Sequence, residues 1–492
     1  MIDFQAYYES TLRAVFDSQI GKVKRPHILV CAPSNSAVDN ILERIIRRGF
    51  NQKNGDQYRP ALLRVGASGV EISRTCFEFC VESKVGGLLS MSTEEWRMWF
   101  SRQLHTVNSF ENDLRNKLRT LTQCRHSTNQ RESDIIAAQI LNAFDIRDRA
   151  IGDLSRLERL RELHDKNRTL DADGMQILRS ILEASFIDEA EIVFTTLAST
   201  GKRSFRECAF GFKTLIVDEA AQASEISILL PLFRGIQNCI LIGDPQQLPA
   251  TVLSQGAKNA YYDRSLFERI TQNGINPILL SMQYRMHSEI RKFPSEHFYN
   301  NLLVDVVDMA SSPIDFELLS SRSANLNLSP YVVFDTCSGF EERNDFGSIK
   351  NEFEAQLSFK LVQLVESAWL RDSRPNLALI TPYAYQCQRL RQYAEVLTLT
   401  CDITVSTIDG FQGRESDFVI LSCVRNTASG MGFMLDTRRL NVALTRAKFG
   451  LWILCSSHNS KVSAVWQALF DDAYERSCVI NKVQLSDLEW IV

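Results

Sequence analysis

The sequence predicts an α/β fold with two parallel-sheet domains in tandem, and three observations support this. A chain of 492 residues is longer than one ordinary hydrophobic core organises. Short β-rich runs alternate with amphipathic segments, as in parallel sheets that helices cover on both faces. A stretch with only helical periodicity interrupts the first of two such regions. We expect a first domain at 1–70 and 191–276, a helical insertion at 71–190 and a second domain at 277–492.

The first domain is expected to contain short strands, four of which are clear in the sequence, each followed by turn residues and then by a polar or amphipathic segment. These runs are His27–Val30, Ile192–Thr195, Leu215–Val217 and Cys239–Ile242. The second domain repeats the pattern with Tyr331–Phe334, Leu377–Ile380, Phe418–Cys423 and Leu451–Leu454.

The insertion predicts two long helices packed as an antiparallel hairpin, because apolar residues recur every three or four positions between charges. An aromatic stripe of this kind can also form a binding face, but packing between the two helices explains it better. The first stripe is Trp96, Phe100, Leu104, Val107, Leu114, Leu118 and Leu121, and the second is Ile136, Ile140, Phe144, Ile151, Leu154, Leu157 and Leu160.

The composition is that of a globular protein, with 45% hydrophobic and 23% charged residues. A net charge of −4 gives no overall basic field, although it says nothing about local basic clefts. Apolar runs are far shorter than the ~20 residues of a membrane span, and the N-terminus does not resemble a signal peptide. The twelve cysteines include no C-x-x-C pair, so we expect buried free thiols of an intracellular protein, with zinc at Cys76 and Cys80 or at Cys124 and His126 as the alternative.

Two adjacent acids, Asp218 and Glu219, follow the apolar run Leu215–Val217. In nucleotide hydrolases an acid at the end of such a strand holds Mg²⁺, and its neighbour orients the attacking water. Taken alone, the pair could equally be two solvated acids at the end of a strand.

Two further strand ends carry polar residues that suit phosphate or nucleic-acid binding. Gly243–Pro249 is a tight Gly-Asp-Pro-Gln-Gln-Leu-Pro loop, in which an ordinary turn explains the glycine, the aspartate and the proline but not the paired glutamines. The run His27–Asn40 ends in Pro33, Ser34 and Asn35, which either cap a helix or grip phosphates.

Basic residues occur in two segments of the second half. Gln283–His287 places Arg285 beside an aromatic residue, and Arg438–Lys448 places Arg439 and Arg446 near one face of a predicted helix. A lone surface arginine usually makes only an exposed ion pair.

The order and spacing of these segments resemble the superfamily 1 helicases of the nonsense-mediated-decay-helicase group, over roughly the whole span His27–Ser456. Their details look most like the senataxin-type branch. The matching segments are Ile28–Asn40, Val193–Thr200, Asp218–Gln222, Gly243–Pro249, Gln283–His287, Thr407–Asp417 and Arg438–Lys448.

The resemblance implies two RecA-like domains that hold ATP and Mg²⁺ and bind single-stranded RNA or DNA. Asp218 would bind Mg²⁺, Glu219 would orient water, Gln247 would sense the γ-phosphate, and Arg285 and Arg446 would act as arginine fingers. Nucleotide contacts would come from Tyr284, which would stack on adenine, and from Gly413 and Glu415. Nucleic-acid contacts would come from Pro33, Ser34, Asn35, Thr196, Thr381, Pro382 and Thr407, mostly to backbone and sugar.

By the same resemblance, the protein is a 5′-to-3′ helicase or translocase that acts on RNA, DNA or RNA–DNA hybrids in RNA processing or transcription termination. We expect a nuclear monomer without a membrane partner, with the cytoplasm as the alternative location.

One departure concerns the G-x-x-x-x-G-K-[ST] loop that relatives carry shortly before the strand matching His27–Val30. Gly21-Lys22-Val23 lacks the first glycine and the hydroxyl, and Gly201-Lys202-Arg203 fails likewise. We expect an incomplete sequence rather than a natural loss, because every later motif keeps its catalytic residue types. The alternative is an inactive nucleic-acid-binding scaffold, and the chain as written should hydrolyse ATP negligibly.

Overall fold

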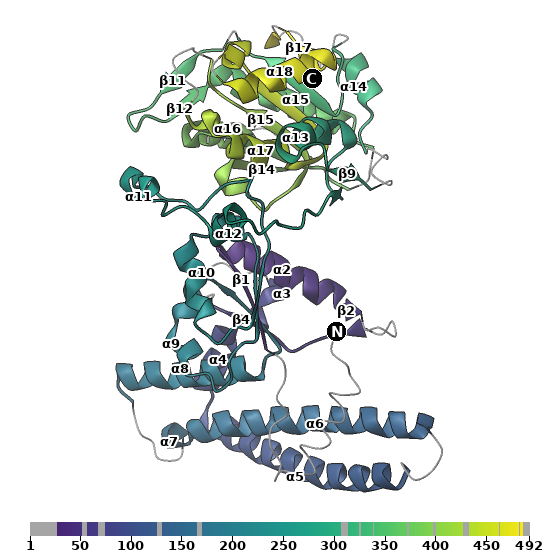
Figure 1. Cartoon of the computed structure of the whole chain (residues 1–492), viewed down its shortest axis with the longest axis vertical. Helices are drawn as coiled ribbons and strands as arrows, with labels where there is room; N and C mark the ends of the chain where they lie inside the picture. Colours follow the sequence, from purple (N-terminus) through teal and green to yellow (C-terminus); the bar gives the residue numbers. More distant parts are fainter. Residues whose placement is uncertain are drawn as a thin grey trace. The chain divides into compact units, whose positions relative to one another are not determined.

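A computed structural model of the chain describes two compact units (Figure 1). Unit 1 comprises residues 1–243 and 250–269, and unit 2 comprises 244–249 and 270–492. The helical insertion counts with unit 1, and the loop at 244–249 counts with unit 2. The described residues are 27–51, 57–66, 74–124, 130–164, 170–306, 313–323, 326–337, 339–370, 373–396, 400–426, 432–461, 463–481 and 483–485.

Unit 1 is built on a parallel sheet of five strands in the order β4-β5-β1-β6-β7. Successive side chains of β1 alternate between two apolar clusters: Leu29 and Cys31 lie in one, and Val30 and Ala32 in the other. The sheet is therefore covered on both faces, as the pattern predicted. The strands are β1 (Ile28–Ala32), β4 (Leu62–Val65), β5 (Ile192–Thr196), β6 (Thr214–Val217) and β7 (Asn238–Leu241).

Helices from before and within the insertion cover these two faces. Val38 and Leu42 of α2 (Asn35–Arg48) and Cys76 of α3 (Arg74–Phe77) pack on one face. The other face packs against apolar residues of α4 (Val81–Leu89) and α8 (Ala172–Glu189). Three helices of the predicted insertion, α3, α4 and α8, are thus part of the body of unit 1.

The two long predicted helices are α5 (Thr93–Cys124) and α6 (Gln130–Arg159), which lie side by side in Figure 1. Near the start of α5 and the end of α6, the Trp96 indole N–H donates to the Leu157 carbonyl at 2.8 Å. Leu104 was expected in the buried stripe, but it is 46% exposed. The side chains of Leu118, Leu121 and Ile136 lie outside the described residues.

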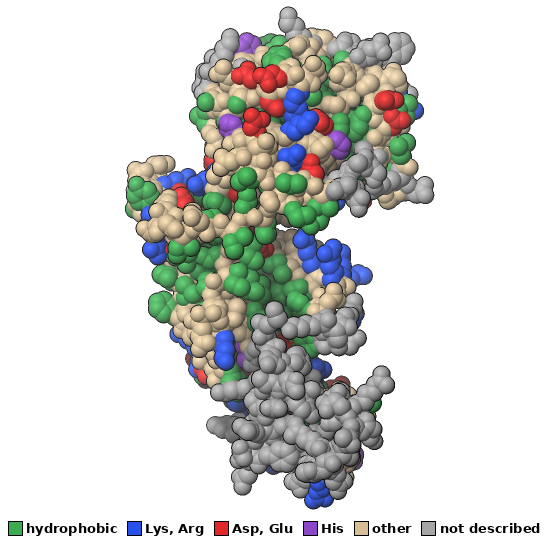
Figure 2. Space-filling view, turned by 45° about the vertical axis from the view of Figure 1, so that its right-hand side comes forward, with side chains coloured by type: hydrophobic (Ala, Val, Ile, Leu, Met, Phe, Trp, Pro, Cys, Tyr) green, Lys and Arg blue, Asp and Glu red, His purple; other side chains and the backbone are tan. Residues whose placement is uncertain are grey.

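The β7 edge of the sheet is open to solvent. Asn238, Cys239 and Ile240 of β7 are exposed, as is Ile242 just after it, whereas the opposite edge strand β4 is mostly buried. Figure 2 shows hydrophobic side chains gathered on one face of unit 1. Further elements of this unit are β2 (Phe50–Asn51), β3 (Gln57–Tyr58), α7 (Arg161–His164), α9 (Arg203–Arg206), α10 (Glu225–Leu232) and α11 (Gln255–Asn259).

Unit 2 contains a six-stranded parallel sheet in the order β14-β13-β15-β16-β10-β17. Tyr331 and Val333 of β10 face one apolar cluster, and Val332 and Phe334 face the other, so this sheet is also covered on both faces. The strands are β10 (Tyr331–Asp335), β13 (Asn376–Thr381), β14 (Asp402–Thr407), β15 (Ser416–Ser422), β16 (Ala447–Cys455) and β17 (Val479–Ile480).

Three helices pack on each face of this sheet. One cluster includes residues of α13 (Ser288–Tyr299), α17 (Thr437–Leu444) and α18 (Ala464–Glu475). The other includes residues of α14 (Phe316–Arg322), α15 (Glu352–Ser367) and α16 (Ala384–Val396). Short elements complete the chain: α12 (Leu266–Gln272), the pair β8 (Met282–Gln283) and β9 (Val304–Asp305), and the antiparallel pair β11 (Glu341–Arg343) and β12 (Ile349–Asn351).

Within the described ranges, no helix combines the length and the apolar character that crossing a bilayer requires. Cys76 and Cys80 are free thiols and are buried, as expected. The described side chains contain no group of three or more His, Cys, Asp or Glu residues that could hold a metal ion. Cys124 and His126, the other pair considered for zinc, have side chains outside the described residues.

Candidate functional site

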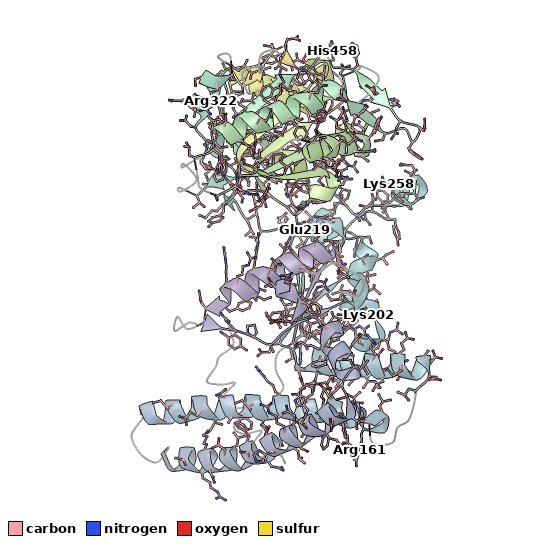
Figure 3. All side chains as sticks on the ribbon, turned by 180° about the vertical axis from the view of Figure 1, so that it is seen from behind. Arg161, Lys202, Glu219, Lys258, Arg322 and His458 are labelled. Atoms are coloured by element: carbon pink, nitrogen blue, oxygen red, sulfur yellow. The ribbon has the colours of Figure 1, made fainter. Side chains whose placement is uncertain are left out.

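The predicted acidic pair lies directly after β6 in unit 1. Glu219 adopts the left-handed conformation, with φ 50° and ψ 39°, and its carboxylate accepts a hydrogen bond from Gln222 Nε2 at 2.5 Å. A non-glycine residue in this conformation stores strain, which is typical of functional turns. Figure 3 labels Glu219 just beyond the ends of the strands of unit 1. Burial raises the pKa of Asp218, an effect that the Glu219 N–H and the Arg44 charge oppose.

The residues that follow β7 contact the backbone of this acidic turn. The Ala220 N–H donates to the Ile242 carbonyl at 2.7 Å. A Cβ atom on Gly243 would lie only 2.8 Å from the Ala221 backbone nitrogen, so glycine permits the close approach. The glycine of the Gly-Asp-Pro loop therefore supports the turn that carries Asp218 and Glu219.

In unit 2 the structure brings together the predicted phosphate sensor and one predicted arginine finger. The Arg446 guanidinium, which is 2% exposed, donates through Nη2 to Gln247 Oε1 at 3.3 Å. Its Nε also donates to the Val442 carbonyl at 2.9 Å. Gln247 and Arg446 are 199 positions apart in the sequence, and the fold places them in one hydrogen-bonded group.

Three residues that the sequence analysis did not single out surround this pair. Asp244 Oδ2 accepts hydrogen bonds from Gln247 Nε2 at 2.8 Å and from the Tyr299 hydroxyl at 2.5 Å. The Tyr299 hydroxyl in turn accepts from Asn441 Nδ2 at 2.7 Å. Burial, together with the nearby Asp244 charge, raises the pKa of Tyr299 well above its ordinary value, so Tyr299 keeps its proton. The unexplained glutamines of the loop were the only sign of this network in the sequence.

The second predicted arginine finger, Arg285, is held by acceptors within unit 2. Its Nε lies 2.9 Å from Glu415 Oε2, and its Nη1 donates to the Thr445 carbonyl at 3.1 Å. Lys448 Nζ lies 3.5 Å from the other Glu415 oxygen. Burial would raise the pKa of Glu415, but Arg285 and Lys448 hold that pKa below its ordinary value. Glu415, predicted to contact the nucleotide, thus pairs with Arg285 in this structure.

The other two predicted nucleotide contacts are accessible. Tyr284 is 70% exposed, so one face of its ring is available for stacking. Gly413 is exposed and has φ 73°, a conformation that favours glycine. Their roles stay predictions.

In unit 1 the strand pairing brings the predicted nucleic-acid residues together. Ala32, the last residue of β1, lies opposite Thr196, the last residue of β5, and Pro33, Ser34 and Asn35 follow directly. Ser34 is exposed and caps α2, because its hydroxyl accepts from the Ala37 N–H at 3.2 Å. Thr196 is 8% exposed and donates to Ser199 Oγ at 2.9 Å.

Asn35 has a structural partner that the sequence analysis missed. Arg64, in the middle of β4, is completely buried and donates through Nη2 to Asn35 Oδ1 at 2.7 Å. Its Nε pairs with Asp39 at 2.8 Å, and its Nη1 donates to the Val65 carbonyl at 2.6 Å. A lone arginine inside an otherwise apolar strand run was the available signal. The amide oxygen of Asn35 is thus oriented by a buried cation.

In unit 2 the pairing of β13 with β14 sets Thr381 directly opposite Thr407, and Pro382 follows. The Thr407 hydroxyl accepts from the Gly410 N–H at 3.1 Å. Thr381 is completely buried, so its side chain does not reach solvent in this structure. Contact between these residues and nucleic acid stays a prediction.

Comparison with known proteins supports the resemblance found in the sequence. Two family models, each described as an AAA domain, match residues 5–255 and 262–458. Helicase SEN1 of Saccharomyces cerevisiae is 35% identical over 93% of this chain. Probable helicase senataxin of Homo sapiens is 31% identical over 94% of this chain. The chain spans 20% and 17% of the length of these two relatives.

A third relative, Regulator of nonsense transcripts 1 of Dictyostelium discoideum, is 34% identical over 67% of this chain, which spans 25% of that protein. Among solved structures, the C-terminal domain of a possible DNA helicase from Lactobacillus plantarum covers 41% of this chain, and the match covers 99% of that domain. Its identity is 14% and its TM-score 0.24, so this likeness carries no argument.

Proposed function

Because the chain belongs to the AAA-domain helicases of superfamily 1, in the branch of Sen1 and senataxin, we propose that it is the motor part of an ATP-dependent helicase or translocase. Its substrate class is single-stranded RNA or DNA, including strands of RNA–DNA hybrids. We further propose 5′-to-3′ movement, action as a monomer and a nuclear location, as the resemblance implies.

The observation that best supports this proposal is the convergence of distant motif residues in unit 2. Gln247, Arg285, Glu415 and Arg446 come from separate segments, yet hydrogen bonds join Gln247 to Arg446 and Arg285 to Glu415. Arg285 also bonds the carbonyl of Thr445, the residue that precedes Arg446. A guanidinium group bonded to an amide, with a second guanidinium group bonded to the preceding residue of the same segment, suits the binding of a triphosphate, whose charge grows on the transferred group during hydrolysis.

On the side of unit 1, Asp218 and Glu219 supply the two carboxylates that phosphoryl transfer needs. Mg²⁺ in such sites takes one or two carboxylates and the substrate's phosphates, so the single carboxylate of Asp218 fits it. When bound, the ion neutralises charge on the phosphate oxygens. Glu219, held by Gln222 in its strained turn, would orient water and accept its proton.

The alternative is a nucleic-acid-binding scaffold that does not hydrolyse ATP. A G-x-x-x-x-G-K-[ST] loop supplies backbone N–H groups and a lysine for the β- and γ-phosphates, so a protein that lacked it would bind nucleic acid without hydrolysing ATP. The five retained residues Asp218, Glu219, Gln247, Arg285 and Arg446 favour the helicase.

A strand-displacement assay tests the proposal. The protein would be the loop-extended chain, defined as the 492 residues preceded by a strand and a G-x-x-x-x-G-K-[ST] loop, as the family resemblance implies. Substrates would be RNA, DNA and RNA–DNA duplexes, each with either a 5′ or a 3′ overhang. The matched control is Glu219→Gln, which keeps the shape of the side chain but removes the carboxylate.

We expect ATP-dependent displacement from 5′ overhangs and none with Glu219→Gln. Displacement from 3′ overhangs alone would overturn the direction but keep the helicase. Tight single-strand binding with no displacement on any substrate would support the scaffold instead.

A further inference from the structure

We infer that Tyr299 is a positioning residue for ATP hydrolysis, which it would serve by fixing the orientation of Gln247 and the place of Arg446. This inference rests on the proposed function. Tyr299 is the last residue of α13, and it lies in none of the motifs that carry the family resemblance. Its hydroxyl nevertheless joins the loop at 244–249 to α17, the helix that leads to Arg446.

The hydrogen-bond chemistry of the network allows only one arrangement. An ionised carboxylate only accepts and a guanidinium only donates. The Gln247 amide must therefore turn its nitrogen to Asp244 and its oxygen to Arg446, at 2.8 and 3.3 Å. Likewise the Tyr299 hydroxyl donates to Asp244 and accepts from Asn441. The orientation of Gln247 thus depends on where the Asp244 carboxylate lies.

Asp244 is held from three directions. Oδ1 accepts from the Gln246 N–H at 2.9 Å, and Oδ2 accepts from both Gln247 Nε2 and the Tyr299 hydroxyl. Of these donors, only Tyr299 comes from outside the loop itself. Removing its hydroxyl would leave Asp244 with donors from its own loop. The loop would then be joined to the rest of unit 2 by the Asn441–Gln246 and Arg446–Gln247 hydrogen bonds.

Asn441 provides the second half of the link. It is completely buried in α17, and its Nδ2 donates to the Tyr299 hydroxyl and to the Gln246 carbonyl at 2.7 and 3.0 Å. Its Oδ1 is buried and has no hydrogen-bond partner among the described residues. A buried amide with an unsatisfied oxygen is destabilising. Asn441 is therefore better explained by the loop that it holds than by the stability of α17.

Removing only the Tyr299 hydroxyl distinguishes a positioning role from a role in packing. Phenylalanine fills nearly the same volume as tyrosine, so Tyr299→Phe should keep the apolar packing at the end of α13. What it removes is one donor to Asp244 and one acceptor for Asn441. If Gln247 and Arg446 act on the phosphate in the transition state, a small displacement of both groups should lower kcat more than it changes KM.

The test measures ATP hydrolysis by the loop-extended chain and its Tyr299→Phe variant in the presence of single-stranded RNA. We expect kcat to fall by about 10- to 100-fold, with KM for ATP changing by less than about threefold. Tyr393→Phe is the matched control, because the Tyr393 hydroxyl also donates to a carboxylate, Glu352, at 2.7 Å in another part of unit 2. It should leave kcat unchanged.

A double-mutant cycle separates positioning from general damage. If Tyr299 acts through Gln247, adding Tyr299→Phe to Gln247→Ala should lower kcat much less than it does in the wild-type background. In the 492-residue chain, Tyr299→Phe should also speed hydrogen exchange at the Gln246 and Gln247 amides without lowering the melting temperature of the protein appreciably.

The outcomes distinguish this inference from the proposed function. Failure of the unsubstituted loop-extended chain to hydrolyse ATP would overturn the proposed function and, with it, this inference. An active chain with unchanged kcat in Tyr299→Phe would overturn the inference alone. A fall in kcat that is equally large in the Gln247→Ala background would also overturn it, because the effect would not pass through Gln247.

Discussion

Removing the carboxylate of Asp39 should destabilise unit 1 far more than removing that of Glu43. Both acids lie on α2, one turn apart, and both pair with an arginine. Asp39 lies 2.8 Å from Arg64, whose side chain is 0% exposed. Glu43 lies 3.4 Å from Arg47, whose side chain is 72% exposed. Asp39→Ala and Glu43→Ala therefore make nearly the same chemical change in two different dielectric surroundings.

The magnitude follows from the burial of Arg64. Leaving a buried charge without its ionic partner costs about 3–5 kcal/mol. Arg64 would keep its hydrogen bonds to Asn35 and the Val65 carbonyl, so we expect about 3 kcal/mol for Asp39→Ala. The better helix propensity of alanine offsets at most ~0.7 kcal/mol of this. Glu43→Ala removes an exposed i,i+4 pair and should change stability by no more than about 0.5 kcal/mol.

Urea unfolding of the 492-residue chain measures both changes, with hydrogen exchange at β1 and β4 reporting on unit 1 specifically. A second substitution tests whether the unpaired buried charge causes the loss. Adding Arg64→Met to Asp39→Ala removes that charge and should restore much of the lost stability. If Asp39→Ala and Glu43→Ala lowered the free energy of unfolding equally, the buried Arg64–Asp39 pair would not stabilise unit 1. The role given to Arg64 in orienting the Asn35 amide would then also be wrong.

Three further predictions follow from other parts of the fold. In the loop-extended chain, Glu219→Gln should lower ATP turnover by ~10²–10⁴-fold while ATP binding and single-strand affinity survive; a wild-type rate would remove Asp218 and Glu219 as the catalytic pair. Burial raises the pKa of Glu354 to about 7, above its value of ~4.3 in an unfolded chain. The native state then holds the proton more tightly, so the urea midpoint of unit 2 should fall as pH rises from about 4.5 to 7, and Glu354→Gln should flatten that fall. The isolated segment 71–190 should give a mainly helical circular dichroism spectrum. Deleting all of it should unfold unit 1, because α4 and α8 carry core residues, whereas replacing only 108–145 by a short Gly-Ser linker should not.

The architecture of both units could be predicted from sequence because strand and helix periodicities alternate clearly. Three strands of the two large sheets, β4, β14 and β17, were not predicted, and the first two have local reasons. In β4 the charged residue Arg64 interrupts the apolar run, which hides the strand. The acid that neutralises this charge, Asp39, lies on another element and cannot be recognised as its partner from the sequence. The polar composition of β14 hides a strand that is only partly buried. The helices α4 and α8 lie within the predicted insertion but pack on the sheet of unit 1, a contact that helical periodicity does not reveal.

The motif residues could be located from sequence, but their partners could not. Tyr299 lies 55 positions from Asp244 and 142 from Asn441, and neither spacing is a pattern that local sequence carries. The pairing of Arg285 with Glu415 likewise joins residues 130 positions apart. Tertiary structure decides which side chains hold a functional residue in place. Sequence reasoning can therefore identify the reacting groups but not the residues that position them.

The most direct test of the proposed motor is steady-state ATP hydrolysis by the 492-residue chain and by the loop-extended chain, each with and without single-stranded RNA or DNA. We expect negligible turnover from the 492-residue chain and nucleic-acid-stimulated turnover on the order of 1 s⁻¹ or faster from the loop-extended chain. Comparable turnover by the 492-residue chain alone would contradict the role given to the missing loop. No turnover by a folded loop-extended chain would contradict the assignment as a nucleic-acid-dependent ATPase.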